Sequence, residues 1–268
     1  MNLQQLGFTH FFEDQLNEHT TDATKIIGRV ILEHKHSYRV MTNQGELLAT
    51  ISGNFAYNAF ARADYPAVGD FVLLEKMAGE NRGIIHHLFK RKSKFTRKMA
   101  GQEVDEQIVA ANVDIVFIVL SLNADFNVRR LERYITAAWD SGAVPILVLT
   151  KADLCEDVSY YEQLAATVAF GVEIIPVSAV SGLGIEQLAS HIKEGVTAAV
   201  LGSSGAGKST LVNALLGYEQ MNVSGIREDD AKGRHTTTHR ELVMLESGGC
   251  LIDTPGMRDL QLWEQGEK

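Results

Sequence analysis

One glycine-rich stretch has the residue types and spacing needed to bind phosphate. Gly202-Ser203-Ser204-Gly205-Ala206-Gly207-Lys208-Ser209 matches the pattern G-x-x-x-x-G-K-[ST], and Thr210 follows it. Glycines let backbone N–H groups curl around phosphate oxygens at the start of a helix. We expect Lys208 to reach the β- and γ-phosphates of a nucleotide and Ser209 to offer its hydroxyl to Mg²⁺. The apolar strand predicted before the motif and the helix predicted after it are the context that this motif requires.

Two further polar elements each follow a predicted apolar strand. Thr150-Lys151-Ala152-Asp153 is similar to the [NT]KxD element with which GTPases read guanine, and Ser178-Ala179 is similar to their short SA[KL] element. The Asp153 carboxylate can accept hydrogen bonds from guanine N1–H and from the exocyclic amine, a pair that adenine does not present. We expect Lys151 to lie over the base plane and the Ser178-Ala179 backbone to meet guanine O6. Together the two elements favour guanine over adenine.

A third element completes the set of expected nucleotide contacts. Asp253-Thr254-Pro255-Gly256 ends an apolar strand, so we expect Asp253 to hold Mg²⁺ through water and the Gly256 N–H to touch the γ-phosphate. Upstream of it, Gly233-Arg234-His235-Thr236-Thr237-Thr238 is similar to a switch I segment. One threonine of this segment would complete the Mg²⁺ shell, and we predict Thr237 or Thr238.

The residue after Gly256 is Met257, where many small GTPases have a glutamine that orients the attacking water. Methionine cannot orient water, so we expect slow hydrolysis that recruits another group or a partner. His235 is a candidate for that group, and an exposed loop histidine without a catalytic role is the alternative.

The order of these elements is unusual. The base reader precedes the phosphate loop, and the γ-phosphate sensor follows it, whereas an ordinary GTPase has its base reader long after the phosphate loop. The sequence therefore predicts a circularly permuted GTPase.

The elements that must position these residues fall into two parts. Residues 1–108 are predicted to form a small barrel, with an OB-fold favoured and an SH3-like barrel as the alternative, after a short helix at Phe8–Leu16. Residues 109–268 alternate apolar strands with amphipathic helices, which predicts an α/β fold with a mostly parallel sheet. The strands expected in the barrel are Lys25–Leu32, Tyr38–Thr42, Glu46–Ser52, Asp70–Glu75 and Gly83–Phe89. Those expected in the second part are Ile115–Leu120, Pro145–Leu149, Val172–Val177, Val196–Leu201, Glu241–Leu245 and Cys250–Asp253, with helices at Val128–Ser141, Tyr160–Phe170, Ile185–Lys193 and Lys208–Leu216.

Composition narrows the class of protein. The formal net charge of −9 argues against a general nucleic-acid coat, but residues 90–98 form a local basic run that includes Phe95. Basic residues with an interleaved aromatic favour contact with RNA, and a solvated linker between domains is the alternative. Neither a long apolar run nor a secretory start is present, and the two cysteines form no C-x-x-C pattern, so we expect a cytoplasmic protein without a membrane span. The histidines at 34, 36, 86 and 87 are interpreted as surface residues and not as metal ligands.

Taken together, these elements make the chain resemble the RsgA (YjeQ) family of circularly permuted GTPases. The resemblance rests on the predicted barrel, Ala111-Asn112-Val113-Asp114, and the four elements quoted above at 150–153, 202–210, 233–238 and 253–256. It implies GTP/GDP and Mg²⁺ as ligands, an OB-fold that contacts ribosomal RNA, and an action late in maturation of the small ribosomal subunit. The family also replaces the glutamine with a hydrophobic residue, and its switch histidine matches His235. We expect a monomer.

One difference from the family is large. The family has a C-terminal zinc-binding subdomain with a Cys/His cluster, and no such cluster is present in this sequence, which we expect to be truncated or partial. This places ribosome docking in question and leaves nucleotide binding intact. Alternatives to the leading hypothesis are an RNA-binding assembly factor that uses GTP only as a conformational switch, a permuted GTPase with another cargo, and a P-loop ATPase.

Overall fold

A closed five-stranded barrel follows the first helix, α1 (His10–Leu16), in the computed structural model, which describes residues 2–16, 22–98, 106–123, 126–203, 205–224 and 240–253. The barrel strands are β1 (Lys25–Glu33), β2 (Tyr38–Thr42), β3 (Gly45–Ile51), β4 (Phe71–Lys76) and β5 (Arg82–Leu88). They follow the order β1-β2-β3-β5-β4, and β4 pairs back with β1 to close the barrel. A short helix, α2 (Gly53–Asn58), and a 3₁₀ turn at Arg62–Asp64 connect β3 to β4.

This order, with β3 and β5 parallel and the other pairs antiparallel, is that of an OB-fold, so the predicted barrel is confirmed. Alternation along β3 shows how the sequence forms it. Leu47 and Ala49 point into the barrel core, and Leu48 between them is 40% exposed.

The second part of the chain is a sheet with helices on both faces. Its strands lie in the order β10-β9-β8-β11-β13-β12, and all are parallel except the edge strand β12. These strands are β8 (Ile115–Ser121), β9 (Val144–Thr150), β10 (Glu173–Pro176), β11 (Thr197–Gly202), β12 (Glu241–Met244) and β13 (Cys250–Asp253). The predicted α/β fold is therefore confirmed.

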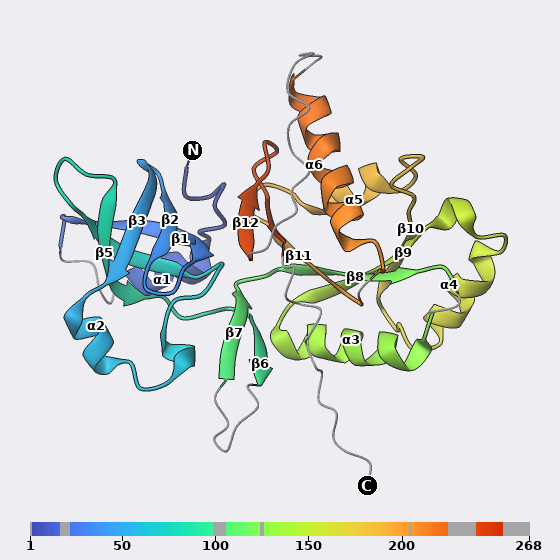
Figure 1. Cartoon of the computed structure of the whole chain (residues 1–268), viewed down its shortest axis with the longest axis horizontal. Coiled ribbons are helices and arrows are strands. Elements are labelled where there is room, and N and C mark those ends of the chain that lie inside the picture. The colour runs from blue at the N-terminus through green and yellow to red at the C-terminus, as the bar shows by residue number, and fades with distance from the viewer. Residues whose placement is uncertain are drawn as a thin grey trace, which may run out of the picture.

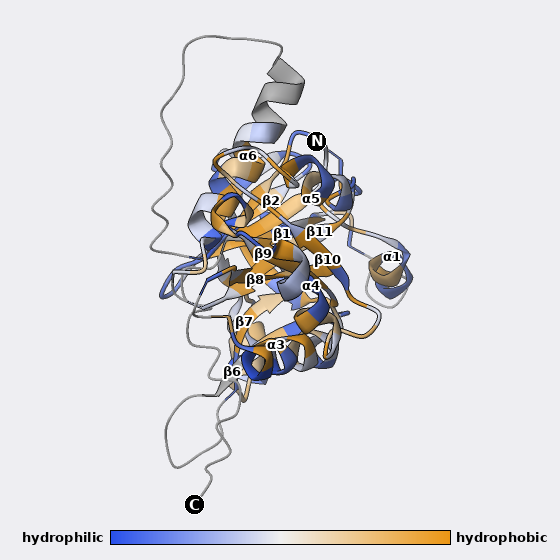
Figure 2. Ribbon diagram, turned by 90° about the vertical axis from the view of Figure 1, so that its right-hand side faces the viewer, coloured by the Kyte–Doolittle hydropathy of each residue, from blue (hydrophilic) through white to orange (hydrophobic). Residues whose placement is uncertain are grey.

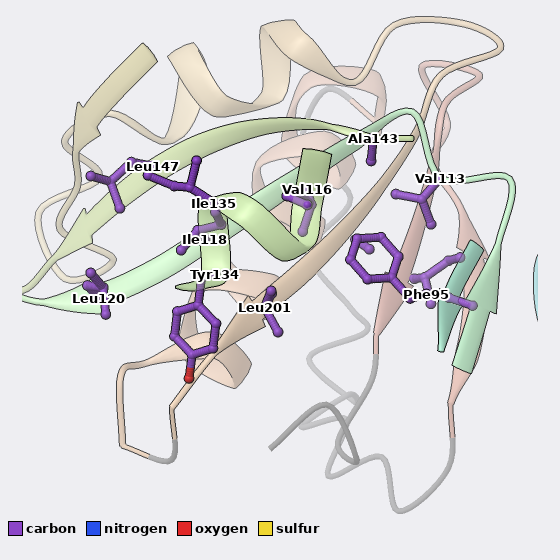
Figure 3. Packing of buried hydrophobic residues seen from close by; sticks show 14 of the residues in the cluster. Phe95, Val113, Val116, Ile118, Leu120, Tyr134, Ile135, Ala143, Leu147 and Leu201 are labelled. Atoms are coloured by element: carbon purple, nitrogen blue, oxygen red, sulfur yellow. The ribbon is translucent and has the colours of Figure 1, made fainter. Parts of the chain in front are cut away.

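Within the described residues, four helices cover this sheet: α3 (Val128–Ser141), α4 (Val158–Ala166), α5 (Ile185–His191) and α6 (Lys208–Ser224). One apolar cluster packs α3 and α4 against one face, and a second packs α5 and α6 against the other. Figure 1 shows α3 on one side of the sheet and α5 with α6 on the opposite side. In Figure 3, Tyr134 and Ile135 of α3 lie over strand residues such as Ile118. The apolar strands form the orange centre of the molecule in Figure 2.

A hairpin that the sequence analysis did not predict lies between the two parts. β6 (Lys94–Lys98) pairs antiparallel with β7 (Glu106–Ala111), and Phe95 is 3% exposed. The interpretation of residues 90–98 as a solvated linker is therefore wrong for residues 94–98. The domain boundary expected after residue 108 falls inside β7, and the division of the chain into two domains stays a prediction.

The barrel and the parallel sheet are joined edge to edge. β12 pairs with β1 at Glu241 and Leu32, which connects both into one sheet of eleven strands. Figure 1 shows β12 between the barrel and the P-loop strand β11. In the described part of the chain, no helix combines the length and the apolarity that a membrane crossing requires.

Candidate nucleotide site

Five parallel strands bring the predicted nucleotide contacts to one edge of the sheet. β8, β9, β10, β11 and β13 run in the same direction, so their carboxyl ends lie on the same side. Thr150 ends β9, Gly202 ends β11 and Asp253 ends β13, and Ser178 follows shortly after β10. Ligands of open α/β sheets bind at this edge. Residues far apart in the permuted sequence are thus gathered in one region.

The phosphate loop connects β11 to the amino end of α6, a helix of 17 residues. Gly202 leaves room for the neighbouring strand, because a Cβ atom there would lie 2.4 Å from the carbonyl oxygen of Val119. Gly207 has a φ of 92°, a left-handed conformation that a side chain disfavours. The start of a helix directs backbone N–H groups outward and carries a positive partial charge, which suit a phosphate. This cradle fits the phosphates of a nucleotide.

Lys208 lies across the loop that it follows. Its ammonium group donates to the carbonyl oxygen of Ser203 at 2.9 Å and also to that of Gly202. Ser209 and Thr210 are exposed at the start of α6, so the Ser209 hydroxyl is accessible to a metal ion. Ser204 lies outside the described residues.

Thr150 connects the predicted base reader to the phosphate loop. Its hydroxyl donates to the carbonyl oxygen of Ala206 at 2.6 Å, and the residue is 6% exposed. Lys151 takes a left-handed conformation with a φ of 62°, and its ammonium group lies 3.4 Å from the carbonyl oxygen of Gly205. The two elements that the permutation separates in sequence are therefore in direct contact.

Asp153 sits in a 3₁₀ turn at Ala152–Leu154, and it is exposed to solvent as a base-reading carboxylate must be. The amide of Ala152 donates to the carbonyl oxygen of Val177 at 3.1 Å, which holds this turn beside the loop that follows β10.

Ser178 has a role in shaping that loop. It is fully buried, its amide donates to the carbonyl oxygen of Leu183 at 3.0 Å, and its hydroxyl accepts from the amide of Ser181 at 3.1 Å. Ala179 is half-buried beside it. Because the Ser178 side chain is occupied within the loop, any contact with guanine O6 must come from the backbone.

Some of the predicted contacts fall at or beyond the limits of the described residues. His235, Thr237, Thr238 and Gly256 lie outside the described residues. Asp253 is described only through its backbone, which pairs with Glu241 at the end of β13.

The basic run at 90–98 has partners within the protein. Arg91 forms a bidentate pair with the buried carboxylate of Asp70, Lys92 pairs with Asp114, and Lys94 pairs with Glu106. Burial raises the pKa of Asp70, although the hydrogen bonds and charge of Arg91 act in the opposite direction. Arg91 and Lys92 thus have structural roles, which the sequence analysis missed because their carboxylate partners lie far away in the chain.

Within the ranges that the structure describes, no group of three His, Cys, Asp or Glu side chains is arranged to hold a metal ion. The nucleotide cradle, in contrast, provides a hydroxyl at Ser209 beside the phosphate position, which fits Mg²⁺ bound together with a nucleotide.

This chain is similar to known proteins over nearly its whole length. A family model described as RsgA GTPase matches residues 88–263. The "Small ribosomal subunit biogenesis GTPase RsgA 2" of Lactiplantibacillus plantarum is 47% identical over 98% of this chain and 73% of its own length. The corresponding "RsgA 1" of Oceanobacillus iheyensis is 43% identical over 99% of this chain and 75% of its own length.

Two solved structures share the fold. YjeQ from Thermotoga maritima has a TM-score of 0.65 at 26% identity and covers 87% of this chain, which in turn matches 75% of that protein. YloQ, described as a circularly permuted GTPase, has a TM-score of 0.64 at 22% identity, with 91% of this chain and 75% of that chain covered.

Proposed function

We propose that this chain, which belongs to the RsgA GTPase family and is a circularly permuted GTP hydrolase, acts in the biogenesis of the small ribosomal subunit. The names of its relatives support the ribosomal part of this proposal. The observation that carries the nucleotide part is the 2.6 Å hydrogen bond from Thr150 to Ala206, which joins base reader and phosphate loop. A cytoplasmic location belongs to the same proposal.

The roles of the site residues follow from their positions. Asp153 would accept hydrogen bonds from the guanine edge, while Lys151 would cover the base. Lys208 would exchange its contacts with the carbonyl oxygens of Gly202 and Ser203 for phosphate oxygens. Backbone N–H groups of the loop and of the α6 start would hold the same phosphates.

Mg²⁺, when bound, would neutralise charge that develops on the phosphates during hydrolysis. Ser209 would hold it directly, together with Thr237 or Thr238, and Asp253 would hold it through water. Gly256 would contact the γ-phosphate through its amide. His235 would position the attacking water, since Met257 cannot.

A hollow on the barrel is our candidate surface for ribosomal RNA. It has a volume of about 690 Å³ and lies between α2 and the end of β5. Its lining includes the asparagines of α2 and two lysines of the basic run, Asn54, Asn58, Lys90 and Lys94. Close by in sequence, Tyr57 is 83% exposed and Phe60 is 93% exposed. Cations that neutralise phosphates and aromatic faces that stack on bases suit single-stranded RNA.

Co-sedimentation with purified small subunits tests the proposal. We expect the chain to pellet with subunits in a salt-dependent manner, and GTP turnover to rise when subunits are added. Lys90→Glu with Lys94→Glu should weaken co-sedimentation and flatten its salt dependence, because each phosphate contact contributes to the salt slope. Arg129→Glu, a charge reversal on the exposed face of α3, is the matched control and should bind normally.

Lys92 and Arg91 are unsuitable for this test, because reversing either would break an ion pair that is shielded from solvent, whereas the pair of Lys94 with Glu106 is exposed and contributes little to stability. If the chain neither pellets with subunits nor responds to them in turnover, the ribosomal role is contradicted. Normal pelleting of the Lys90 and Lys94 variant would move the RNA contact to another surface.

A further inference from the structure

β1 carries an arginine in the middle of an apolar strand. Arg29 lies in the sequence KIIGRVILE and is 1% exposed. Its guanidinium group stacks over the ring of Phe71, 4.8 Å from the ring centre. The side chain lies where the barrel meets the parallel sheet.

The hydrogen bonds of Arg29 reach separate segments of the chain. Nε donates to the carbonyl oxygen of Gly69 at 2.9 Å, in the barrel loop before β4. Nη1 donates to the carbonyl oxygen of Leu6 and to the hydroxyl of Thr197, both at 2.7 Å. Nη2 donates to the carbonyl oxygen of Asn112 at 3.1 Å. One side chain therefore holds the amino-terminal segment, the barrel, the connection after β7 and the parallel sheet together.

One of its contacts, Thr197, starts a strand that leads to the nucleotide site, and β13 starts beside it at Cys250. Thr197 is the first residue of β11, which ends at Gly202 of the phosphate loop. Cys250, the first residue of β13, is fully buried and pairs with Thr197 across the two strands, and its thiol donates to the carbonyl oxygen of Gln5 at 3.8 Å. β13 ends at Asp253. With a rise of about 3.3 Å per residue, the six residues of β11 place the arginine roughly 20 Å from the phosphate loop.

The junction is closely packed around this side chain. Gly69 has a φ of 96°, and a Cβ atom there would lie 2.0 Å from the carbonyl oxygen of Ala111. A Cβ atom at Gly7 would lie 3.0 Å from Nη1 of Arg29. Water therefore has little room to replace a lost hydrogen bond.

The chemistry of the partners is also unusual. In the described part of the chain, the groups that accept from Arg29 are neutral, and the two nearest acids are engaged elsewhere, Asp70 by Arg91 and Asp114 by Lys92. Burial lowers the pKa of the Arg29 guanidinium. Replacing a buried charge by an apolar residue of similar volume often leaves the stability of a protein unchanged or raises it. Stability alone therefore does not account for an arginine at this position.

We propose that Arg29 is a positioning residue of the nucleotide site, which fixes the starts of β11 and β13 against the barrel and so couples nucleotide binding to the barrel. The coupling is reciprocal. If bound nucleotide favours one packing of the barrel, then a barrel held in that packing binds nucleotide more tightly. This inference goes beyond the ribosomal function, and it can be tested without subunits.

Amide hydrogen exchange with and without GDP and Mg²⁺ measures this coupling. In the wild-type chain, we expect nucleotide to slow exchange at the phosphate loop and also at the amides of Gly69 and Asp70, which donate to barrel carbonyl oxygens at 2.9 and 3.0 Å. The expected slowing in the barrel is about fivefold or more, the lower end of coupling between two sites. Arg29→Lys keeps the charge but cannot make the forked set of bonds, so the barrel response should disappear while the loop response remains.

Arg91→Lys is the matched control. Arg91 is also shielded from solvent, with its side chain 13% exposed, but its partners Asp70, Ala63 and Tyr65 all belong to the barrel. It should lose stability and keep the barrel response to nucleotide, which separates coupling from general destabilisation.

Thr197→Val provides a second variant in case Arg29→Lys does not fold. It removes one acceptor of Nη1 with little change in shape, and we expect it to reduce the barrel response at least about twofold. A wild-type barrel that does not respond to nucleotide would overturn the proposal. A full barrel response to nucleotide in the Arg29→Lys variant would also overturn it. If Arg29→Lys is unfolded, a full barrel response in Thr197→Val would do the same.

Discussion

Thr150→Val tests the contact that joins the two halves of the nucleotide site. Valine has nearly the shape of threonine but cannot donate a hydrogen bond. The variant loses the 2.6 Å bond to the carbonyl oxygen of Ala206 and a longer one, at 3.4 Å, to that of Leu120. Since Thr150 is 6% exposed, water cannot readily take its place.

The magnitude follows from the cost of leaving a buried acceptor unpaired, about 1–3 kcal/mol. In the free variant, the phosphate loop can relax so that the Ala206 carbonyl reaches water. A nucleotide must then restore the original loop, so much of this cost appears as weaker binding. We expect the dissociation constant for GDP to rise by roughly tenfold, which corresponds to about 1.4 kcal/mol.

Isothermal titration calorimetry with GDP and Mg²⁺ measures this change, and thermal unfolding of each variant checks that it is folded. Thr150→Ser retains the hydroxyl and should bind GDP within about threefold of the wild-type chain. If the valine variant binds GDP as tightly as the wild type, the hydroxyl has no part in aligning the site, and our reasoning is refuted.

Four other changes are expected to have separate effects. Lys208→Ala should abolish tight GTP binding and hydrolysis without unfolding the chain, and unchanged GTP affinity in a folded variant would contradict the phosphate-loop assignment. Asp153→Asn should weaken GTP and admit xanthine nucleotide, because an amide can pair with the xanthine carbonyl, and a competition assay with both nucleotides measures this. His235→Ala should lower subunit-stimulated turnover by roughly 10²-fold with GTP affinity nearly intact, and equal stimulated rates would remove His235 from the mechanism. Burial raises the pKa of Tyr38 to about 12, so its ionisation should be absent from the main phenol titration near pH 10. The free energy of unfolding should fall as pH rises above about 10, because this tyrosine ionises at a lower pH in the unfolded chain than in the folded one. Tyr38→Phe should remove the late absorbance change.

Elements with a strong local pattern could be predicted from the sequence. β8 is a continuous apolar run and appears as a buried strand, and α3 was predicted with the bounds that it has, because Asn127 and Gly142 cap it in the expected way. α4 begins at Val158 and not at Tyr160, because the Asp157 side chain accepts from the Tyr160 amide and so caps the helix two residues earlier.

Features that depend on distant partners could not be predicted. Residues 94–98 are too rich in charge to show the pattern of a strand, and the strand forms by pairing with β7, which is not adjacent in sequence. Arg29 gives only one local signal, a single charge within an apolar strand, and its hydrogen-bond partners extend from Leu6 to Thr197. The motif order predicted which residues meet at the sheet edge, but the bond between Thr150 and Ala206 required the structure.

A crystal structure of the chain with a non-hydrolysable GTP analogue and Mg²⁺ tests the central claim most directly. We predict the guanine N1–H and amine within hydrogen-bonding distance of Asp153, the β- and γ-phosphates beside Lys208, and the metal ion bound to the Ser209 hydroxyl. A nucleotide bound away from the carboxyl ends of β9 and β11, or a base that does not contact Asp153, would contradict the account.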